Sequence, residues 1–212
     1  MSIEPFLEIT GAASALLLIV GLVVGQLNGE WRIWPAPPVG SLKSFGFWTL
    51  FRTLNVVVLF LGIERFLTTL RGDAVPLRIA LAAVSLIAGV AYAYTLWSLG
   101  RKATYCQASG LATDGVYRWT RNPQYATAIM AFVTLGLAAA AWDATLLAGS
   151  LVIVYAMMAR AEEPWLETRY GRSYLDYKTE VPRFFNLRHA AATLSAFVAN
   201  RSPSLAKQPR SK

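Results

Sequence analysis

The sequence predicts an all-α, polytopic membrane protein with about five transmembrane helices and a cytoplasmic amphipathic helix near its carboxyl end. Hydrophobic residues make up 55% of the 212 positions and charged residues only 15%. The apolar residues occur in runs too long for the faces of a soluble globule. Several runs can cross a bilayer core of roughly 30 Å at about 1.5 Å per residue. The tryptophans fall at the ends of these runs, as interfacial aromatic residues do.

The first three predicted spans are residues 9–26, 45–67 and 79–100. Residues 122–159 contain Asp143 as their only charge, but a single helix of this length would be roughly 57 Å long. This stretch must therefore form two spans. Trp142 and Asp143 mark the break, because an interfacial aromatic followed by a helix-starting Asp is typical of a tight helical hairpin.

The positively charged residues predict the orientation. With five spans, one face collects 16 Lys and Arg residues, while the other collects Arg65, Arg71 and Arg78, and Arg52 stays inside the second span. Because the face richer in Lys and Arg is normally cytoplasmic, we expect a protein of the inner or cytoplasmic membrane. Its amino terminus would lie outside and its carboxyl terminus in the cytoplasm. The net charge of +8 then reflects topology and attraction to membrane lipids, with no nucleic-acid partner.

The residue types exclude several chemistries. Cys106 is the only cysteine and His189 the only histidine. The chain therefore has no intrachain disulfide, no Cys/His metal cluster and no Ser-His-Asp set. We expect no metal, and any chemistry must use Arg, Glu, Tyr, Asn and backbone groups.

A polar stretch at residues 110–125 lies between two apolar blocks. The short hairpin at Trp142 should return the fifth span beside the fourth, which brings Glu162 and Glu163 to the face that carries Arg121. Pro123 can occupy the first turn of the fourth span with Asn122 as its cap. Each group also has a simpler explanation. The arginines of this stretch could bind lipid phosphate, and Glu162 and Glu163 could lie at a solvated helix end.

An amphipathic helix is predicted after the fifth span. Leu166, Tyr170, Tyr174 and Tyr177 recur at intervals of four, four and three and would share one face. Pro182 would end this helix. It could lie on the bilayer surface or form a lid over a site at the cytoplasmic end.

Spaced motifs follow one another in the second half of the chain. They are Leu111-x-Thr113-x-Gly115-x-Tyr117-x-x-x-Arg121-x-Pro123-x-Tyr125, Glu162-Glu163-x-x-Leu166, Tyr170-Gly171-x-x-Tyr174-x-x-Tyr177 and Val181-Pro182-Arg183-Phe184. Over roughly residues 99–184 the chain resembles the isoprenylcysteine carboxyl methyltransferase and phospholipid methyltransferase family. The resemblance implies a membrane enzyme that binds S-adenosylmethionine at the cytosolic end of its helices. Its acceptor would be an isoprenylcysteine-type carboxylate, a phospholipid amine or a small thiol.

The resemblance also implies site residues. The cofactor-binding residues would be Gly115, Tyr117, Arg121, Asn122, Pro123, Tyr125, Glu162 and Glu163. Arg121 would hold the cofactor carboxylate, Glu162 or Glu163 its ammonium or ribose hydroxyls, and tyrosines would face the adenine or sulfonium. No catalytic residue is assigned, because methyl transfer mainly needs alignment and exclusion of water. The family often has His where this chain has Asn122, and an amide cannot act as a base near neutral pH.

Substrate contacts are predicted at Arg52, Asn55, Tyr174, Tyr177 and Arg183. Arg52 and Asn55 lie three apart on the second span, where intramembrane polar residues often point into the bundle. They could line a substrate portal or make a structural hydrogen bond between helices. A lateral opening beside them would admit an apolar tail.

We divide the chain into a three-span region (1–100), a cofactor-binding loop, helical hairpin and lid helix (101–185) and a cytoplasmic tail (186–212). Two other functions remain open from the sequence. Sterol reductases, which use NADPH, resemble the same carboxyl-terminal helical region. A non-catalytic membrane protein could use the loop to bind headgroups or a partner.

Overall fold

The computed structural model describes residues 3–35, 37–104, 110–186, 191–192 and 194–195, and in residues 101–104 it describes the backbone only. Their regular secondary structure is helical, with no strand in the described ranges. The α-helices are α1 (Glu4–Leu27), α2 (Leu42–Thr68), α3 (Val75–Thr104), α4 (Pro123–Ala139), α5 (Trp142–Tyr170) and α6 (Arg172–Glu180), with 3₁₀ turns η1 (Gly29–Trp31) and η2 (Gly115–Arg118). Cys106, His189 and most of the predicted tail lie outside the described residues.

The helices confirm the predicted polytopic architecture. Four of them, α1, α2, α3 and α5, are long and apolar enough to cross a membrane, and α4 is a shorter apolar helix. At about 1.5 Å per residue, the 17 residues of α4 span roughly 25 Å. The 29 residues of α5 span roughly 43 Å, well beyond a bilayer core of about 30 Å, so its last turns from Arg160 project past the membrane.

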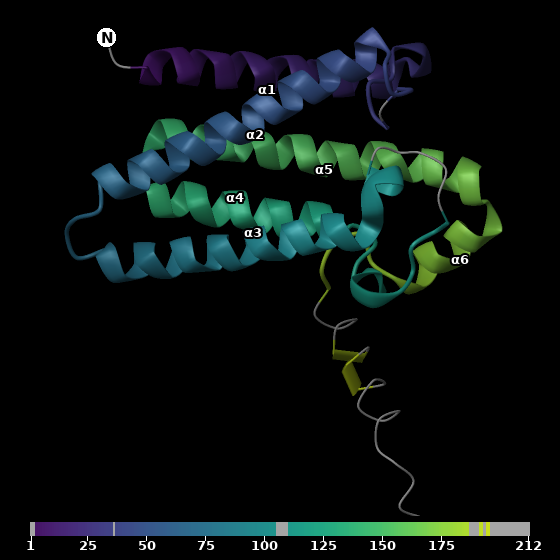
Figure 1. The fold of residues 1–212 in the computed structure, drawn as a ribbon. Helices are drawn as coiled ribbons and strands as arrows, with labels where there is room; N and C mark the ends of the chain where they lie inside the picture. The colour runs from purple at the N-terminus through teal and green to yellow at the C-terminus, as the bar shows by residue number, and fades with distance from the viewer. Residues whose placement is uncertain (1–2, 36, 105–109, 187–190, 193, 196–212) are drawn as a thin grey trace, which may run out of the picture.

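The bundle has two distinct ends. Figure 1 shows α4 and α5 side by side, α3 along α4, and α1 and α2 on the other side of α5. We call the end with the α2–α3 and α4–α5 connections the hairpin end, and the opposite end, where α6 lies, the α6 end. The α4–α5 connection at Ala140 and Ala141 confirms the predicted break beside Trp142. Gly136 on α4 lets the hairpin close tightly, because a Cβ there would come within 2.9 Å of the Ala148 Cβ.

Two arginines join the helices at the hairpin end. Arg65 on α2 makes ion pairs with Glu4 and Asp143, both at 2.8 Å, and with Glu8 at 3.1 Å, and so connects α2 with α1 and α5. The buried Arg78 on α3 donates hydrogen bonds to carbonyls in α4 and near the end of α2. These carbonyls belong to the last turns of helices, where intrahelical partners are missing.

The predicted amphipathic helix is corrected by the structure. The helical stretch over Leu166–Tyr177 is broken at Gly171, so its first half belongs to α5 and its second half to α6. Gly171 has φ +54° and ψ −129°, a conformation that residues with a Cβ rarely adopt. The bend still brings Leu166, Tyr170 and Tyr174 into one apolar cluster, because the two short helical faces turn toward each other.

Candidate functional site

The site at the α6 end begins with a loop held against the segment after α6. The Arg121 backbone N–H donates to the Pro182 carbonyl at 2.9 Å. The Thr120 hydroxyl and the Asn122 side-chain amide both donate to the Arg183 carbonyl, at 2.9 and 3.2 Å. Asn122 precedes α4 as predicted, but its side chain makes no capping hydrogen bond. The predicted position of Asn122 as the cap of α4 is therefore confirmed, while its amide joins the loop to the segment after α6.

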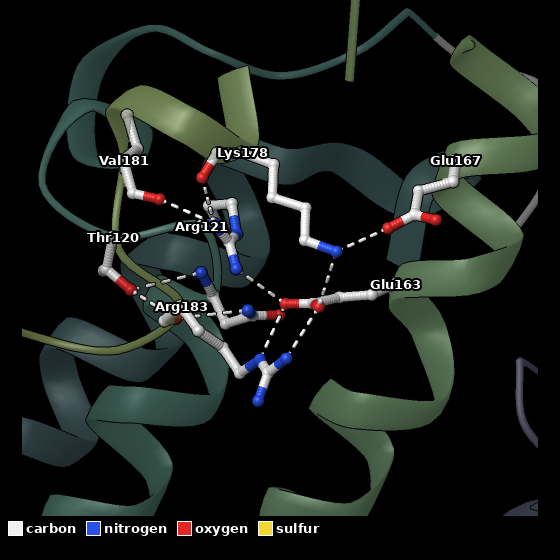
Figure 2. Close-up of polar contacts among 8 residues, drawn as sticks. Thr120, Arg121, Glu163, Glu167, Lys178, Val181 and Arg183 are labelled. Atoms are coloured by element: carbon white, nitrogen blue, oxygen red, sulfur yellow. Dashed lines mark hydrogen bonds and ion pairs between the residues drawn. The ribbon is translucent and has the colours of Figure 1, made fainter. Parts of the chain in front are cut away.

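Glu163 is the centre of an ion-pair cluster that we call the Glu163 cluster, formed by Arg121, Glu163, Lys178 and Arg183 (Figure 2). Arg183 donates from two nitrogens to the two carboxylate oxygens, each at 2.7 Å. Arg121 donates to Glu163 at 2.8 Å, and Lys178 lies 3.6 Å away. Burial alone would raise the pKa of Glu163, but the hydrogen bonds from Arg183 and Arg121 outweigh it and lower the pKa to about 2.

Arg121 also completes the end of α6. Its Nη1 donates to the carbonyls of Lys178 and Val181, at 2.7 and 2.8 Å. Both carbonyls lie where α6 ends and intrahelical donors run out. Arg121 thus links the loop, α5 and α6 through contacts within the protein. The hypothesis that it holds a cofactor carboxylate stays a prediction.

Glu162 differs from its neighbour, since it is half-buried and lines two cavities. The Tyr125 hydroxyl donates to its carboxylate at 2.7 Å. Burial raises the pKa of Glu162 above its ordinary value, and the hydrogen bond from Tyr125 offsets part of that rise. Adjacent residues on a helix point about 100° apart, which lets Glu163 face the cluster while Glu162 faces the cavities.

The larger of the two cavities, which we call the inner cavity, has a volume of about 320 Å³. This lies at the lower end of the range of small-molecule sites. It is lined from α2, α3, α4, α5 and the segment before α2 by Trp34, Trp48, Phe51, Arg52, Asn55, Tyr92, Leu96, Leu99, Gln124, Tyr125, Tyr155, Met158 and Glu162. The predicted substrate residues Arg52 and Asn55 thus share one cavity with the predicted cofactor residues Tyr125 and Glu162.

Both sequence-based alternatives for Asn55 find support in its contacts. Its side-chain oxygen accepts a hydrogen bond from the Tyr155 hydroxyl at 2.8 Å, which joins α2 to α5. Its amide donates to the Phe51 carbonyl at 2.7 Å. Asn55 therefore makes a structural interhelical bond and also lines the inner cavity. The Arg52 guanidinium lies 5.5 Å from the centre of the Trp48 ring.

The smaller cavity, which we call the outer cavity, lies beside α6 and has a volume of about 60 Å³. Its lining combines aromatic and polar residues: Leu99, Gly110, Leu111, Ala112, Tyr117, Arg121, Asn122, Gln124, Glu162, Trp165, Leu166, Tyr170, Tyr174 and Tyr177. Burial raises the pKa of Tyr117, Tyr174 and Tyr177, so these hydroxyls stay protonated near neutral pH.

Tyr174 is the outer-cavity residue whose environment points most directly to a ligand. Its side chain is 1% exposed, and its hydroxyl has no hydrogen-bond partner in the described part of the chain. By contrast, the Tyr177 hydroxyl donates to the Tyr117 carbonyl at 2.7 Å, and the Tyr117 hydroxyl donates to Gln124 at 3.2 Å. A buried hydroxyl without a partner carries a free-energy cost that a ligand acceptor would remove.

Several predicted residues lie outside the lining of both cavities. Glu163 and Arg183 belong to the Glu163 cluster, Pro123 is the first residue of α4, and Gly115 begins η2 with φ +61°. Sequence reasoning also missed cavity residues, among them Trp34, Tyr92, Gln124, Tyr155 and Trp165. Gln124 had a usable signal, because it lies between Pro123 and Tyr125 in the recognised motif.

The fold is that of a polytopic membrane protein, with two adjacent cavities at one end of its bundle that share Leu99, Gln124 and Glu162 in their linings. Residues 77–173 match the model of the phospholipid methyltransferase family, which confirms the family resemblance indicated by the motifs. The matched range contains η2, α4, all of α5 with Glu162 and Glu163, and nearly all of α3. By class, the match describes a membrane methyltransferase. No curated protein and no solved structure matches the chain.

Proposed function

We propose that this protein transfers a methyl group from S-adenosylmethionine, bound in the outer cavity, to the amine of a phospholipid-like acceptor in the inner cavity. The observation that carries the proposal is a shared wall. Leu99, Gln124 and Glu162 line both cavities, so ligands in the two cavities would meet beside these residues. In-line methyl transfer requires this kind of juxtaposition, with the reacting atoms about 3–3.5 Å apart.

The residues of the outer cavity fit the proposed donor. When bound, S-adenosylmethionine supplies an electrophilic methyl carbon on a positively charged sulfur. Tyrosine and tryptophan rings attract such a cation, and Tyr117, Tyr170 and Trp165 line the cavity. The buried Tyr174 hydroxyl is a donor in need of an acceptor, and Glu162 can accept from ribose hydroxyls or an ammonium group.

The small volume of the outer cavity leads us to expect that α6 moves when the methyl donor binds. At about 60 Å³ it is well below the roughly 300–1,000 Å³ of small-molecule sites, and together with the inner cavity it only reaches the lower end of that range. We therefore expect donor binding to move the tyrosines of α6 outward and to change the exchange of amide hydrogens in α6. The Glu163 cluster would hold the carboxyl end of α6 during this movement.

An apolar groove in the membrane suits the tail of the acceptor. A third cavity of about 590 Å³, which we call the lateral cavity, is lined by α2, α3 and α4 and has an almost wholly apolar surface. Asn55 and Tyr92 line both the lateral and the inner cavity, so the two cavities lie next to each other. A lipid tail in the lateral cavity would position its headgroup in the inner cavity.

The charges in the inner cavity favour an amine over a carboxylate as acceptor. Arg52 suits the phosphate of a phospholipid, and Glu162 at the shared wall would attract an ammonium group and repel a carboxylate. The Glu162 carboxylate would accept a proton from this ammonium. The amine nitrogen would then bond to the methyl carbon as the carbon–sulfur bond breaks and its electron pair passes to sulfur.

We propose that the α6 end is cytoplasmic, because Arg121, Lys178 and Arg183 of the cation-rich predicted face lie there. This orientation would expose the outer cavity to the cytoplasm and the lateral cavity to lipid.

The decisive experiment compares ligands on purified protein in detergent. We expect S-adenosylmethionine and S-adenosylhomocysteine to raise the unfolding temperature and NADPH to leave it unchanged. Labelled S-adenosylmethionine should then transfer its methyl group to phosphatidylethanolamine and not to a prenylated cysteine carboxylate. Stabilisation by NADPH alone would favour a reductase, and no stabilisation by any of the three would favour a binding protein.

Glu162→Gln tests the proposed role of the shared wall. We expect it to lower kcat by about 100-fold or more while the unfolding temperature changes little, because general-base contributions are typically about 10²–10⁴-fold. Glu180→Gln is the matched control, since Glu180 is exposed at the end of α6 and lies outside both cavity linings. Equal activity of the two variants would overturn the role of Glu162.

A further inference from the structure

We propose that a separate pocket at the α6 end, lined by Arg32 and Arg160, binds the headgroup phosphate of an anionic phospholipid. This pocket, which we call the arginine pocket, lies between the end of α1, the segment after η1 and α5 and has a volume of about 270 Å³. The inference does not depend on the proposed function, because the pocket shares neither Glu162 nor any α6 residue with the cavities described above.

The lining has the charge expected of an anion site. Its charged residues are Arg32 and Arg160, with no carboxylate in the lining, and Gln26 adds an amide donor. Neither arginine has an ion-pair partner within 4.0 Å among the described residues. Arginine is well suited to phosphate, because its planar guanidinium can donate two parallel hydrogen bonds.

The backbone of α1 explains why the two arginines come together. Gly21 and Gly25 lie four residues apart, on one face of α1. A Cβ on Gly25 would come within 3.1 Å of the Arg32 Cα, and one on Gly21 within 2.6 Å of the Ile33 side chain. The two glycines therefore let the segment after η1 lie directly on α1, beside the pocket that Arg160 of α5 also lines.

The surroundings favour a lipid over a soluble anion. The end of α1 beside the pocket exposes apolar side chains, with Leu27 84% and Val23 42% exposed. In a polytopic protein these side chains face acyl chains. The pocket thus joins an apolar surface to two cations, which matches a phospholipid with a net negative headgroup.

Trp34 lies between this pocket and the inner cavity, since it lines both. The side chain is buried and stacks on Phe47 with ring centres 5.1 Å apart. A lipid in the arginine pocket would therefore stabilise the wall of the inner cavity from behind.

The test measures the unfolding temperature of the full-length protein in detergent during titration with phosphatidylglycerol. We expect saturable stabilisation, and at least fivefold weaker apparent affinity in Arg32→Gln/Arg160→Gln. The control Arg71→Gln/Arg172→Gln removes the same charge from exposed sites outside the pocket and should keep the wild-type affinity.

Two further arms identify the source of the phosphate. At equal concentration, glycerol 3-phosphate and phosphatidylcholine should each raise the unfolding temperature at least fivefold less than phosphatidylglycerol does. Stabilisation by glycerol 3-phosphate equal to that by phosphatidylglycerol would overturn the lipid assignment in favour of a soluble phosphate.

Equal loss of affinity in the control variant would overturn the pocket in favour of general surface charge. If the double variant does not fold, Arg160→Gln alone should weaken phosphatidylglycerol binding, and unchanged affinity would refute the site.

Discussion

Both ends of the helical bundle use arginines to join helices, but at the α6 end a carboxylate beside the arginine cluster also faces two cavities. At the hairpin end, Arg65 gathers carboxylates from α1 and α5, and Arg78 binds carbonyls at the ends of α2 and α4. At the α6 end, the Glu163 cluster has the same joining role, while the adjacent Glu162 faces the inner and outer cavities. The difference suggests that stability and function can be separated between neighbouring residues of one helical turn.

The largest expected effect on stability comes from the Glu163 cluster. Glu163→Gln should lower the free energy of unfolding by about 3–5 kcal/mol, because it leaves the buried Arg121 without its carboxylate. Unfolding in mixed detergent micelles, followed by circular dichroism, measures this change. The control is Glu167→Gln, whose half-exposed pair with Lys178 should contribute about 1 kcal/mol or less. Equal losses in the two variants would contradict the central role of Glu163.

Acid should weaken the same cluster. Because the pKa of Glu163 is lowered from 4.5 to about 2 on folding, its stabilisation is fully present above about pH 4.5 and is lost as the pH falls toward 2. The difference between these pKa values corresponds to roughly 3 kcal/mol. Unfolding free energies measured between pH 6 and 3 should fall more steeply for the wild type than for Glu163→Gln. Parallel curves would rule out this contribution.

A smaller effect on stability is expected at the hairpin end. Arg65→Met should cost about 1–3 kcal/mol, because it leaves Glu4, Glu8 and Asp143 close together without their shared cation. The proposed methyl transfer, measured per folded molecule, should stay at the wild-type rate, since Arg65 lies at the opposite end from the inner and outer cavities. A loss of kcat in fully folded Arg65→Met would break the proposed separation between the two ends.

The smallest expected effect is that of Tyr174→Phe, which should leave the free protein as stable or more stable but weaken ligand binding. Tyr174→Phe removes a buried hydroxyl without a described partner, so the free protein should be unchanged or more stable by up to about 1 kcal/mol. Affinity for S-adenosylmethionine should nevertheless fall about 3–10-fold, as expected for loss of one hydrogen bond. Calorimetry on both proteins checks this. Destabilisation without a loss of affinity would assign the hydroxyl a structural role only.

Hydropathy was sufficient to predict the helices, but it could not predict where the backbone bends. The apolar runs and the break at Trp142 follow from length and charge, which the bilayer restricts strongly. The tyrosine spacing continued across Gly171 as though one helix covered it, because side-chain periodicity carries no information about a single φ angle. The bend became visible only with the backbone.

The sequence also predicted which groups meet at the site, but it did not predict their separate roles. The short α4–α5 hairpin correctly indicated that Arg121 and Glu163 come together. It could not distinguish the role of Glu162 from that of Glu163. The two side chains point in different directions from α5, and what each one meets depends on how α6 and α2 pack against that helix. Tyr92 and Tyr155 were missed because a single tyrosine within an apolar span is compatible with contact with lipid.

The inner cavity has one further consequence for how such proteins could diversify. Its α2 wall, with Trp48, Phe51, Arg52 and Asn55, precedes the family-matched range of residues 77–173, whereas the outer cavity and Glu162 lie largely within it. Reaction chemistry and choice of acceptor would therefore be inherited from different parts of the chain. A chimera that exchanges only residues 1–74 should retain the methyl donor and accept a different molecule, which makes the amino-terminal third the natural target for redesign.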